Sequence, residues 1–204
     1  ISLPYCFRHK DCEKIEKIVA YARKHGYNGF LVRNIEEVAY LKNIDYQGEI
    51  IGDASVYVWN KVAYEFWSSQ LNGLTCPYEL NYHEYSDMLK GHFEEKPVYG
   101  RIPMMISANC LQKTTNLCEF TDKQRVISLQ DRYQKEFPVY TNCHYCYNVI
   151  YNSVPLSLHK ELDRMKGDMV KRLTFTVESI RETYDILCFF EKLITDKAAK
   201  LPYK

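Results

Sequence analysis

The chain has 204 residues, of which 46% are hydrophobic and 26% charged, and its formal net charge at pH 7 is +1. These values are typical of a globular protein of one domain or slightly more, which can form its core without disulfides. A charge so close to zero creates no overall field that demands nucleic acid or membrane, although a local basic patch is still compatible with it. No apolar run approaches the ~18 residues of a transmembrane helix and no signal peptide is visible, so we expect no membrane partner.

Eight cysteines are distributed over the chain. Half of them lie scattered in helix-like or strand-like segments, unlike the dense framework of a small secreted disulfide protein. These four are Cys6, Cys12, Cys76 and Cys188. A reducing, cytoplasmic compartment is therefore expected. The chain opens on Ile1, without a methionine, and we expect it to be a piece of a longer protein.

Short apolar runs alternate with helically periodic segments through the first half of the chain. The runs predict strands, and the periodic segments predict helices that have Asn34 and Asn60 as N-caps. The predicted strands are 1–5, 29–33, 48–53, 74–80 and 98–107. The predicted helices are 11–25, 34–41, 60–71 and 82–90.

The same alternation returns near the end of the chain. Residues 156–165 predict a helix, 171–176 a strand and 179–194 an amphipathic helix, in which Ser179 and Glu182 have capping-box spacing. The apolar stripe of this last helix is expected to face the core, or alternatively a partner, and consists of Ile180, Tyr184, Leu187 and either Phe189 or Phe190.

Strand and helix alternate about every 20 to 25 residues, which is the rhythm of repeated βα units and a parallel sheet. No glycine-rich phosphate loop follows a strand, which argues against a dinucleotide-binding sheet. The predicted fold class is α/β, a partial TIM-type (β/α) barrel with a cysteine-rich insertion that contains a short β hairpin. The predicted domains are barrel βα units in 1–108, the cysteine-rich insertion in 109–153, and the final barrel strand and helix in 154–204.

The other four cysteines lie in the insertion. Cys143 and Cys146 form a C-x-x-C pair, a spacing at which both sulfurs can reach one ion. Cys110 and Cys118 are separated by seven residues and could complete the site. Strand-like patches lie between the two pairs, and a hairpin formed by them would bring the pairs together. We therefore expect these four cysteines to be metal ligands.

Three interpretations of these cysteines stay open. In the first, four thiolates hold an iron–sulfur cluster or a zinc ion; the uneven spacing weakens the zinc pattern, which has two C-x-x-C pairs. In the second, all four are small buried hydrophobic residues. In the third, the C-x-x-C pair is redox-active. His144 lies inside the pair and could replace one sulfur, but a histidine in such a place is more often an outer group, and we do not predict it as a ligand.

Several motifs together resemble the collagenase-like peptidase family U-thirty-two. The resemblance covers most of the chain, and the combination is far more specific than any single motif. The motifs are Gly100-Arg-Ile-Pro-Met-Met-Ile-Ser-Ala-Asn-Cys, Leu129-Gln-Asp-Arg, Phe137-Pro-Val, Cys143-x-x-Cys146, Ile150-Tyr-Asn-Ser and, upstream, Asn60-Lys-Val-Ala and Glu79-Leu-Asn.

The resemblance implies a TIM-type barrel, of which this chain would be the later part, with the remainder of the parent chain as its partner. Members are labelled proteases although no catalytic machinery is agreed for them. Relatives hydroxylate RNA bases or assist ubiquinone hydroxylation, and some hold an iron–sulfur cluster on four cysteines. Carried over to this sequence, those ligands are Cys110, Cys118, Cys143 and Cys146.

Three functions follow as expectations. The favoured one is an iron–sulfur-dependent RNA-hydroxylation enzyme in the parent, with RNA as substrate. The second is a peptidase that acts on peptides, as the family label says. The third is a non-catalytic binding module stabilised by zinc, because a zinc ion closed by four thiolates is structural and cannot activate water. The sequence has neither H-E-x-x-H nor G-x-S-x-G, and His92-Phe-Glu-Glu is more consistent with a solvated loop.

In a barrel, chemistry is located where strands end and loops begin. Glu79 follows a predicted strand and could be a general base or bind a cation, although an exposed or ion-paired carboxylate is the more ordinary interpretation. Arg101 could hold a carboxylate or phosphate in a bidentate manner, or pair with Glu79. Asp53 and Asn60 complete the candidates, with Asn60 as a cofactor-binding residue. Arg132, in the predicted hairpin, is expected to be structural.

Overall fold

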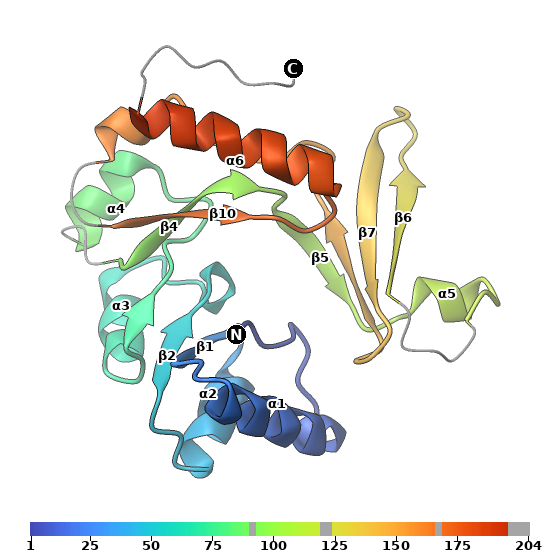
Figure 1. Cartoon of the computed structure of the whole chain (residues 1–204), viewed down its shortest axis with the longest axis horizontal. Coiled ribbons are helices and arrows are strands. Elements are labelled where there is room, and N and C mark those ends of the chain that lie inside the picture. Colours follow the sequence, from blue (N-terminus) through green and yellow to red (C-terminus); the bar gives the residue numbers. More distant parts are fainter. Residues whose placement is uncertain (90–92, 119–123, 166–168, 196–204) are drawn as a thin grey trace. The chain divides into compact units, whose positions relative to one another are not determined.

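A computed structural model describes residues 1–89, 93–118, 124–165 and 169–195 of the chain (Figure 1). The chain divides into two compact units, the first formed by 1–97 and 166–171 and the second by 98–165 and 172–204. The fold is mixed α/β, with three separate sheets among the described residues. None of these sheets closes into a barrel, so the partial barrel and the three predicted domains stay predictions.

Unit 1 contains a parallel sheet with the order β1-β2-β3, each strand of which is followed by a helix. The strands are β1 (Gly29–Val32), β2 (Glu49–Gly52) and β3 (Gly73–Leu74). The helices are α1 (Cys12–Lys24), α2 (Ile35–Asn43), α3 (Lys61–Ser68) and α4 (Tyr82–Leu89), with short 3-10 turns η1 (His9–Asp11) and η2 (Ala54–Val56). The predicted βα alternation is thus confirmed in this unit.

Local sequence explains where these elements begin and end. Asn34 and Asn60 are N-caps as predicted: each side-chain oxygen accepts a hydrogen bond from the backbone N–H three residues on, at 3.0 and 2.9 Å. The predicted first strand forms only an isolated bridge, between Ser2 and Leu31. The predicted strand 74–80 is reduced to β3 and a bridge from Thr75 to Glu95, because the proline at position 77 cannot donate to a ladder.

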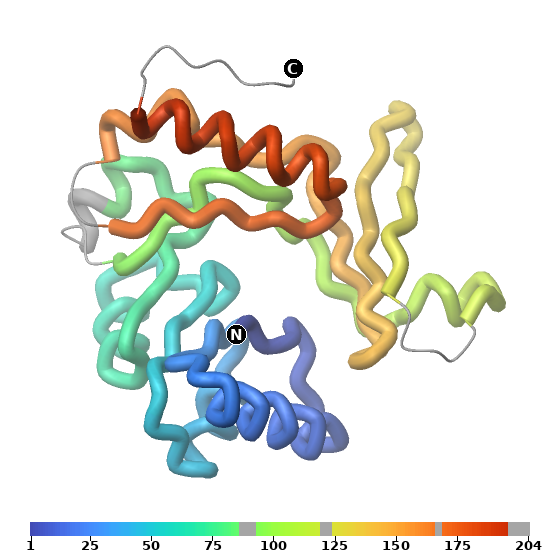
Figure 2. Tube along the Cα trace, viewed as in Figure 1, coloured from blue at the N-terminus to red at the C-terminus, as the bar shows by residue number. Residues whose placement is uncertain are grey.

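The predicted strand 98–107 is two strands that belong to different sheets. β4 (Glu95–Gly100) lies between β10 (Val170–Thr174) and β9 (Leu156–Ser157), and β5 (Pro103–Ser107) begins a second sheet. Figure 2 shows β4 and β10 side by side although they are far apart in the sequence. The strand breaks at Gly100, whose φ of +144° only glycine adopts readily.

The predicted hairpin is present in the second sheet, which is antiparallel and has the order β5-β8-β7-β6. Its other strands are β6 (Arg125–Gln130), β7 (Glu136–Asn142) and β8 (Tyr147–Tyr151). The short helix α5 (Leu111–Thr114) lies in the connection between β5 and β6. Figure 1 shows α5 beside the end of β7 at which the chain turns into β8.

The helix predicted at 156–165 is wrong. This segment forms β9 and a 3-10 turn, η3 (Leu162–Arg164), because Leu156 pairs with Gly100 on the edge of β4, and Leu158 N–H donates to the Val98 carbonyl at 2.8 Å. Pairing with a distant strand has overridden the local helical pattern.

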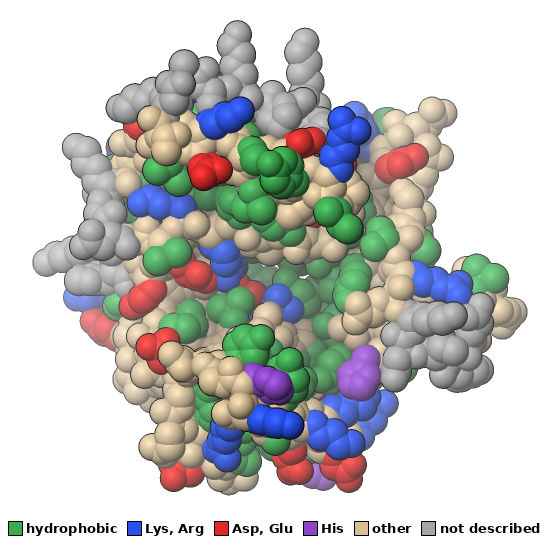
Figure 3. Space-filling view, in the orientation of Figure 1, with side chains coloured by type: hydrophobic (Ala, Val, Ile, Leu, Met, Phe, Trp, Pro, Cys, Tyr) green, Lys and Arg blue, Asp and Glu red, His purple; other side chains and the backbone are tan. Residues whose placement is uncertain are grey.

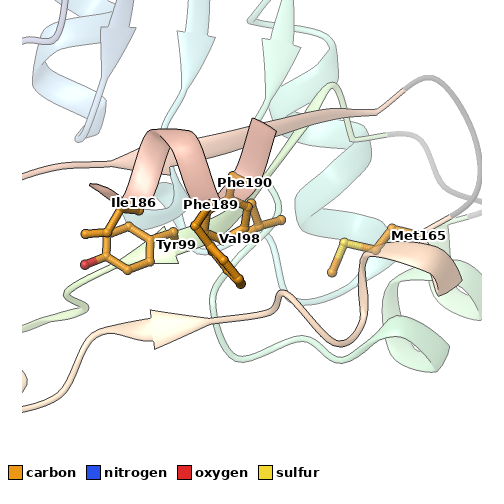
Figure 4. Packing of buried hydrophobic residues seen from close by; sticks show 6 residues of the cluster. All are labelled: Val98, Tyr99, Met165, Ile186, Phe189 and Phe190. Carbon is orange, nitrogen blue, oxygen red and sulfur yellow. The ribbon is translucent and has the colours of Figure 1, made fainter. Parts of the chain in front are cut away.

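The last helix, α6 (Ile180–Thr195), begins with the predicted capping box: Ser179 N–H donates to Glu182 Oε2 at 2.7 Å and Glu182 N–H donates to Ser179 Oγ at 3.3 Å. Its buried face agrees with the prediction only in part. The cluster it joins consists of Val98, Tyr99, Met165, Ile186, Phe189 and Phe190 (Figure 4). Of the predicted stripe, Phe189 and Phe190 are buried as expected, whereas the other members, Ile180, Tyr184 and Leu187, are exposed. Figure 3 shows hydrophobic side chains on the surface over α6.

Candidate metal centre

A tight turn between β7 and β8 holds Cys143 and Cys146. Asn142 and Tyr147 form the last pair of the ladder, so the four residues 143–146 make the turn. The Asn142 side-chain oxygen accepts a hydrogen bond from Tyr145 N–H at 3.2 Å, and Cys146 has a φ of +53°, which directs the chain back along β8. The Cys146 thiol donates to the Cys143 carbonyl at 3.6 Å.

The segment that carries Cys110 and Cys118 is fixed beside this turn by the sheet. β5 pairs with β8 up to Ser107 and Asn148, three residues before Cys110. The Asn148 side chain, which is fully buried, donates to the Asn109 carbonyl at 2.7 Å. From α5, the buried Gln112 side chain donates to Thr141 Oγ1 at 2.9 Å. These two contacts hold the connection that begins at Cys110 against β7 and β8.

The other three cysteines of the candidate site lie near enough to Cys143 to act on the pKa of its thiol. Burial is the main reason that the pKa of the Cys143 thiol is raised, and the charges of Cys110, Cys118 and Cys146 each raise it further. A hydrogen bond with Thr141 Oγ1, 3.9 Å from Cys143 Sγ, acts in the opposite direction. All three other cysteines therefore lie within electrostatic range of Cys143, although up to 33 residues separate them in the sequence.

The donor set suits a thiophilic metal. Thiolates prefer zinc and iron–sulfur clusters, and the mutual repulsion of several thiolates would be relieved by a bound cation. As they stand, no three Cys, His, Asp or Glu side chains in the described part of the chain are placed so as to hold one ion. Binding would therefore require the sulfurs to draw closer together. His144 packs its ring edge-on against Tyr145, with the ring centroids 4.9 Å apart.

Arg101 serves to join two segments of unit 2. Its Nη1 donates to the carbonyls of Asn152 and Ser153 at 3.0 and 2.6 Å, and its Nε lies 4.0 Å from Glu178 Oε1. The carboxylate that Arg101 approaches within unit 2 is that of Glu178, and its pairing with Glu79 stays a prediction. Arg132 lies over the Tyr133 ring, 4.6 Å from its centroid, in the exposed turn of the hairpin.

Glu79 is exposed, on the loop that follows β3. This loop is held by Lys96, which is 1% exposed and donates to the carbonyls of Pro77 and Leu80 at 2.5 and 2.9 Å. Burial lowers the pKa of Lys96, while nearby Cys76 and Glu79 raise it. The lysine was missed in the sequence because it follows Glu94 and Glu95, a charged run that is typical of a solvated segment. His92, the first residue of the His92-Phe-Glu-Glu motif, lies outside the described residues.

Asp53 and Arg33 form an ion pair at the carboxyl ends of β2 and β1. Arg33 Nε donates to Asp53 Oδ2 at 3.1 Å, and the other Asp53 oxygen accepts from Ala54 N–H at 2.8 Å. Arg33 also donates to the Leu3 carbonyl and lies over the Tyr5 ring. The sequence signal for Arg33 is a charged residue directly after an apolar strand. Asn60, at the start of α3, acts as an N-cap, and its role in cofactor binding stays a prediction.

Glu37 is buried next to this ion pair. Its Oε2 accepts a hydrogen bond from Arg33 N–H at 2.7 Å, and its Oε1 has no hydrogen-bond partner among the described residues. Burial raises the pKa of Glu37 to about 8, against the opposing effect of Arg33 and Asn34. The carboxyl group is therefore protonated in the folded protein at neutral pH.

The free energy of unfolding should consequently fall as pH rises from about 4.5 to 8, because the folded state keeps a Glu37 proton that the unfolded state releases, with a slope of up to ~1.4 kcal/mol per pH unit. Glu37→Gln keeps an acceptor for Arg33 N–H and removes this contribution, so the variant should match the wild type below pH 4.5 and exceed it at pH 8. Urea unfolding at several pH values measures the slope. Glu36→Gln, at an exposed neighbour, should retain it; an unchanged slope in Glu37→Gln would contradict this assignment.

Comparison of the chain with protein-family models, curated proteins and solved structures finds no match. The resemblance to family U-thirty-two therefore stays a prediction. None of the helices within the described ranges is long and apolar enough to cross a membrane.

Proposed function

We propose that this chain is part of an enzyme of the U-thirty-two type in which Cys110, Cys118, Cys143 and Cys146 hold an iron–sulfur cluster, and that the parent hydroxylates RNA bases in the cytoplasm. The observation that carries the proposal is the influence of all three other thiols on Cys143. The four cysteines lie on one hairpin and its neighbouring loop and are partly exposed. They are therefore not simply small hydrophobic residues of a core, and metal ligation gives a reason for their presence.

The residues of the chain have distinct roles in this proposal. A bound cluster would supply electrons, which an oxygenating modification needs. The β7–β8 turn would present one pair of thiolates, and Asn148 and Gln112 would hold the loop with the other pair at the same place. The Cys143 thiol donates to Thr141 Oγ1, and this contact lowers the pKa of Cys143, toward the thiolate that a metal needs.

Structural zinc is the second candidate, and the shape of the β7–β8 turn favours it. A C-x-x-C pair on a tight turn between two antiparallel strands is a common half of a zinc site. Zinc bound by four thiolates would stabilise the hairpin without taking part in a reaction, and the chain would then be a binding module.

We further infer that unit 1 and the strands that follow are the later part of a (β/α) barrel. β1, β2 and β3 are parallel neighbours, a parallel bridge from Thr75 to Glu95 joins β4 to β3, and β10 lies next to β4. This succession, with helices between the strands, is the order in which barrel strands follow one another. The remainder of the parent chain would supply the missing strands.

Anaerobic purification of the parent, followed by metal and sulfide analysis and a visible spectrum, tests the proposal. We expect iron and sulfide in similar amounts and a brown colour, and RNA from cells that lack the parent should lose one hydroxylated nucleoside. Zinc without sulfide would select the binding module. Less than about one equivalent of any metal, together with four freely reactive thiols, would exclude both candidates.

A further inference from the structure

The carboxyl end of α1 presents a short stack of exposed aromatic rings. The Tyr21 ring packs against the rings of His25 and Tyr27, with centroid distances of 4.2 and 6.1 Å. Gly26, with a φ of +72°, ends the helix, and Tyr27 N–H donates to the Ala22 carbonyl at 3.0 Å, which returns Tyr27 to the helix. Tyr21 and Tyr27 are 53% and 50% exposed, so the outer ring faces are open to solvent.

A cleft of about 550 Å³ adjoins this stack and shares Tyr27 with it. The cleft lies where the chain enters β1, β2 and β3, at the end of the sheet opposite to Asp53 and Arg33, and Arg23, Tyr46 and Glu49 also line it. A Cβ at Gly48 would collide with the Tyr46 hydroxyl, so the glycine leaves room for this ring in the wall. The volume is within the range of sites that hold a small molecule or one nucleotide.

The charged groups in the cleft, Arg23 and Glu49, do not take part in the hydrogen bonds or ion pairs that hold the described part of the fold together. Among the described residues, neither the Arg23 guanidinium nor the Glu49 carboxylate has a hydrogen bond or an ion pair. Both act on the Tyr46 hydroxyl: burial raises the pKa of Tyr46, Arg23 lowers it and Glu49 raises it. A cation, a carboxylate and a phenol thus converge on one open space.

We propose that the aromatic stack and the adjoining cleft bind single-stranded nucleic acid. Successive bases would stack on Tyr21 and Tyr27, as on the platforms of single-strand-binding proteins, while Arg23 and the exposed Lys24 contact phosphates. One nucleotide occupies the cleft, where the Glu49 carboxylate accepts a hydrogen bond from the exocyclic amino group of a base such as cytosine. Uracil has no such donor, so the cleft favours cytosine. The choice of RNA over DNA as the ligand rests on the proposed function. The proposal that this surface binds single-stranded nucleic acid does not depend on that function.

Fluorescence anisotropy with labelled twelve-residue oligo(C) and oligo(U) RNA and the parent protein tests this inference. The Tyr21→Ala/Tyr27→Ala variant should bind oligo(C) at least tenfold more weakly than the wild type, since each stacked base contributes roughly 1–3 kcal/mol. Glu49→Ala, which removes the hydrogen-bond acceptor, should lose most of the preference for oligo(C) over oligo(U). Tyr184→Ala, which removes an exposed helical tyrosine on α6, is the matched control and should bind normally.

Circular dichroism and metal content are measured on every variant, so that a failure of the metal proposal is seen separately. The inference is overturned if the double variant stays folded and binds within twofold of the wild type, or if Tyr184→Ala weakens binding equally. Equal binding of duplex RNA would also overturn it, because paired bases cannot stack on the rings. An unchanged ratio of cytosine to uracil binding in Glu49→Ala would overturn the assignment of the cleft. If single-stranded DNA binds as tightly as RNA, the proposal that this surface binds single strands is supported, but the proposed selectivity for RNA is refuted.

Discussion

Cys143→Ser should reduce the metal content of the anaerobically purified parent to below about a tenth of the wild-type value, because loss of one of four ligands opens the site. Cys143 is the sharpest choice, since Cys110, Cys118 and Cys146 all act on its thiol. Metal analysis is combined with counting of reactive thiols: the three remaining cysteines should become reactive together when the metal is lost.

Cys12→Ser is the matched control for this experiment. Cys12 is also partly exposed, but it begins α1 in unit 1. This variant should keep the full metal content. If Cys143→Ser retains as much metal as Cys12→Ser, the four cysteines do not form a shared site, and the iron–sulfur and zinc proposals both fail.

Gly100→Ala should destabilise the protein by about 3 kcal/mol or more. The residue has a φ of +144°, and a Cβ there would lie 2.6 Å from the Thr174 carbonyl oxygen, which is a backbone atom of β10 and cannot rotate away. Strain and steric collision therefore act together, at the place where β4 ends and its neighbour β10 also ends. Urea unfolding measures the loss.

Gly26→Ala separates the two causes. Gly26 also has a positive φ, of +72°, but nothing lies within 4 Å of the position of its missing Cβ. We expect this substitution to cost only about 1 kcal/mol, the conformational part alone. Equal losses for the two variants would show that the contact with Thr174 is not close in solution.

Local patterns were sufficient where one segment determines its own structure. Apolar runs predicted β1 and β2, asparagine side chains predicted the starts of α2 and α3, and the patches around Val126 and Phe137 predicted the hairpin. In each case the signal is a strand pattern or a cap that acts within a few residues.

Where a distant strand decides, the sequence was misleading. Residues 156–165 have a helical pattern, yet Leu156 and Ser157 complete the edge of β4. On α6, the apolar residues are distributed around much of the helix. The pattern identified Phe189 or Phe190 as buried but missed Ile186, and it included residues that are exposed. Only the position of β4 under the helix determines that choice.

The candidate site shows the same division. The C-x-x-C spacing was enough to nominate Cys143 and Cys146, whereas the residues that position the other pair, Asn148 and Gln112, have no pattern of their own. Their role depends on the pairing of β5 with β8 and on the placement of α5, which are tertiary facts.

The bonds of Arg101 have a consequence for how this protein can be altered. They tie the residue directly after β4 to Asn152 and Ser153, and Asn152 N–H also donates to the Ile102 carbonyl at 2.9 Å. These hydrogen bonds join the two ends of the segment between Arg101 and Ser153, which contains the β5-β8-β7-β6 sheet. A segment whose ends are joined in this way can be replaced, in evolution or by design, by one of another length and with other side chains. The pairing of β4 with β10 does not depend on it.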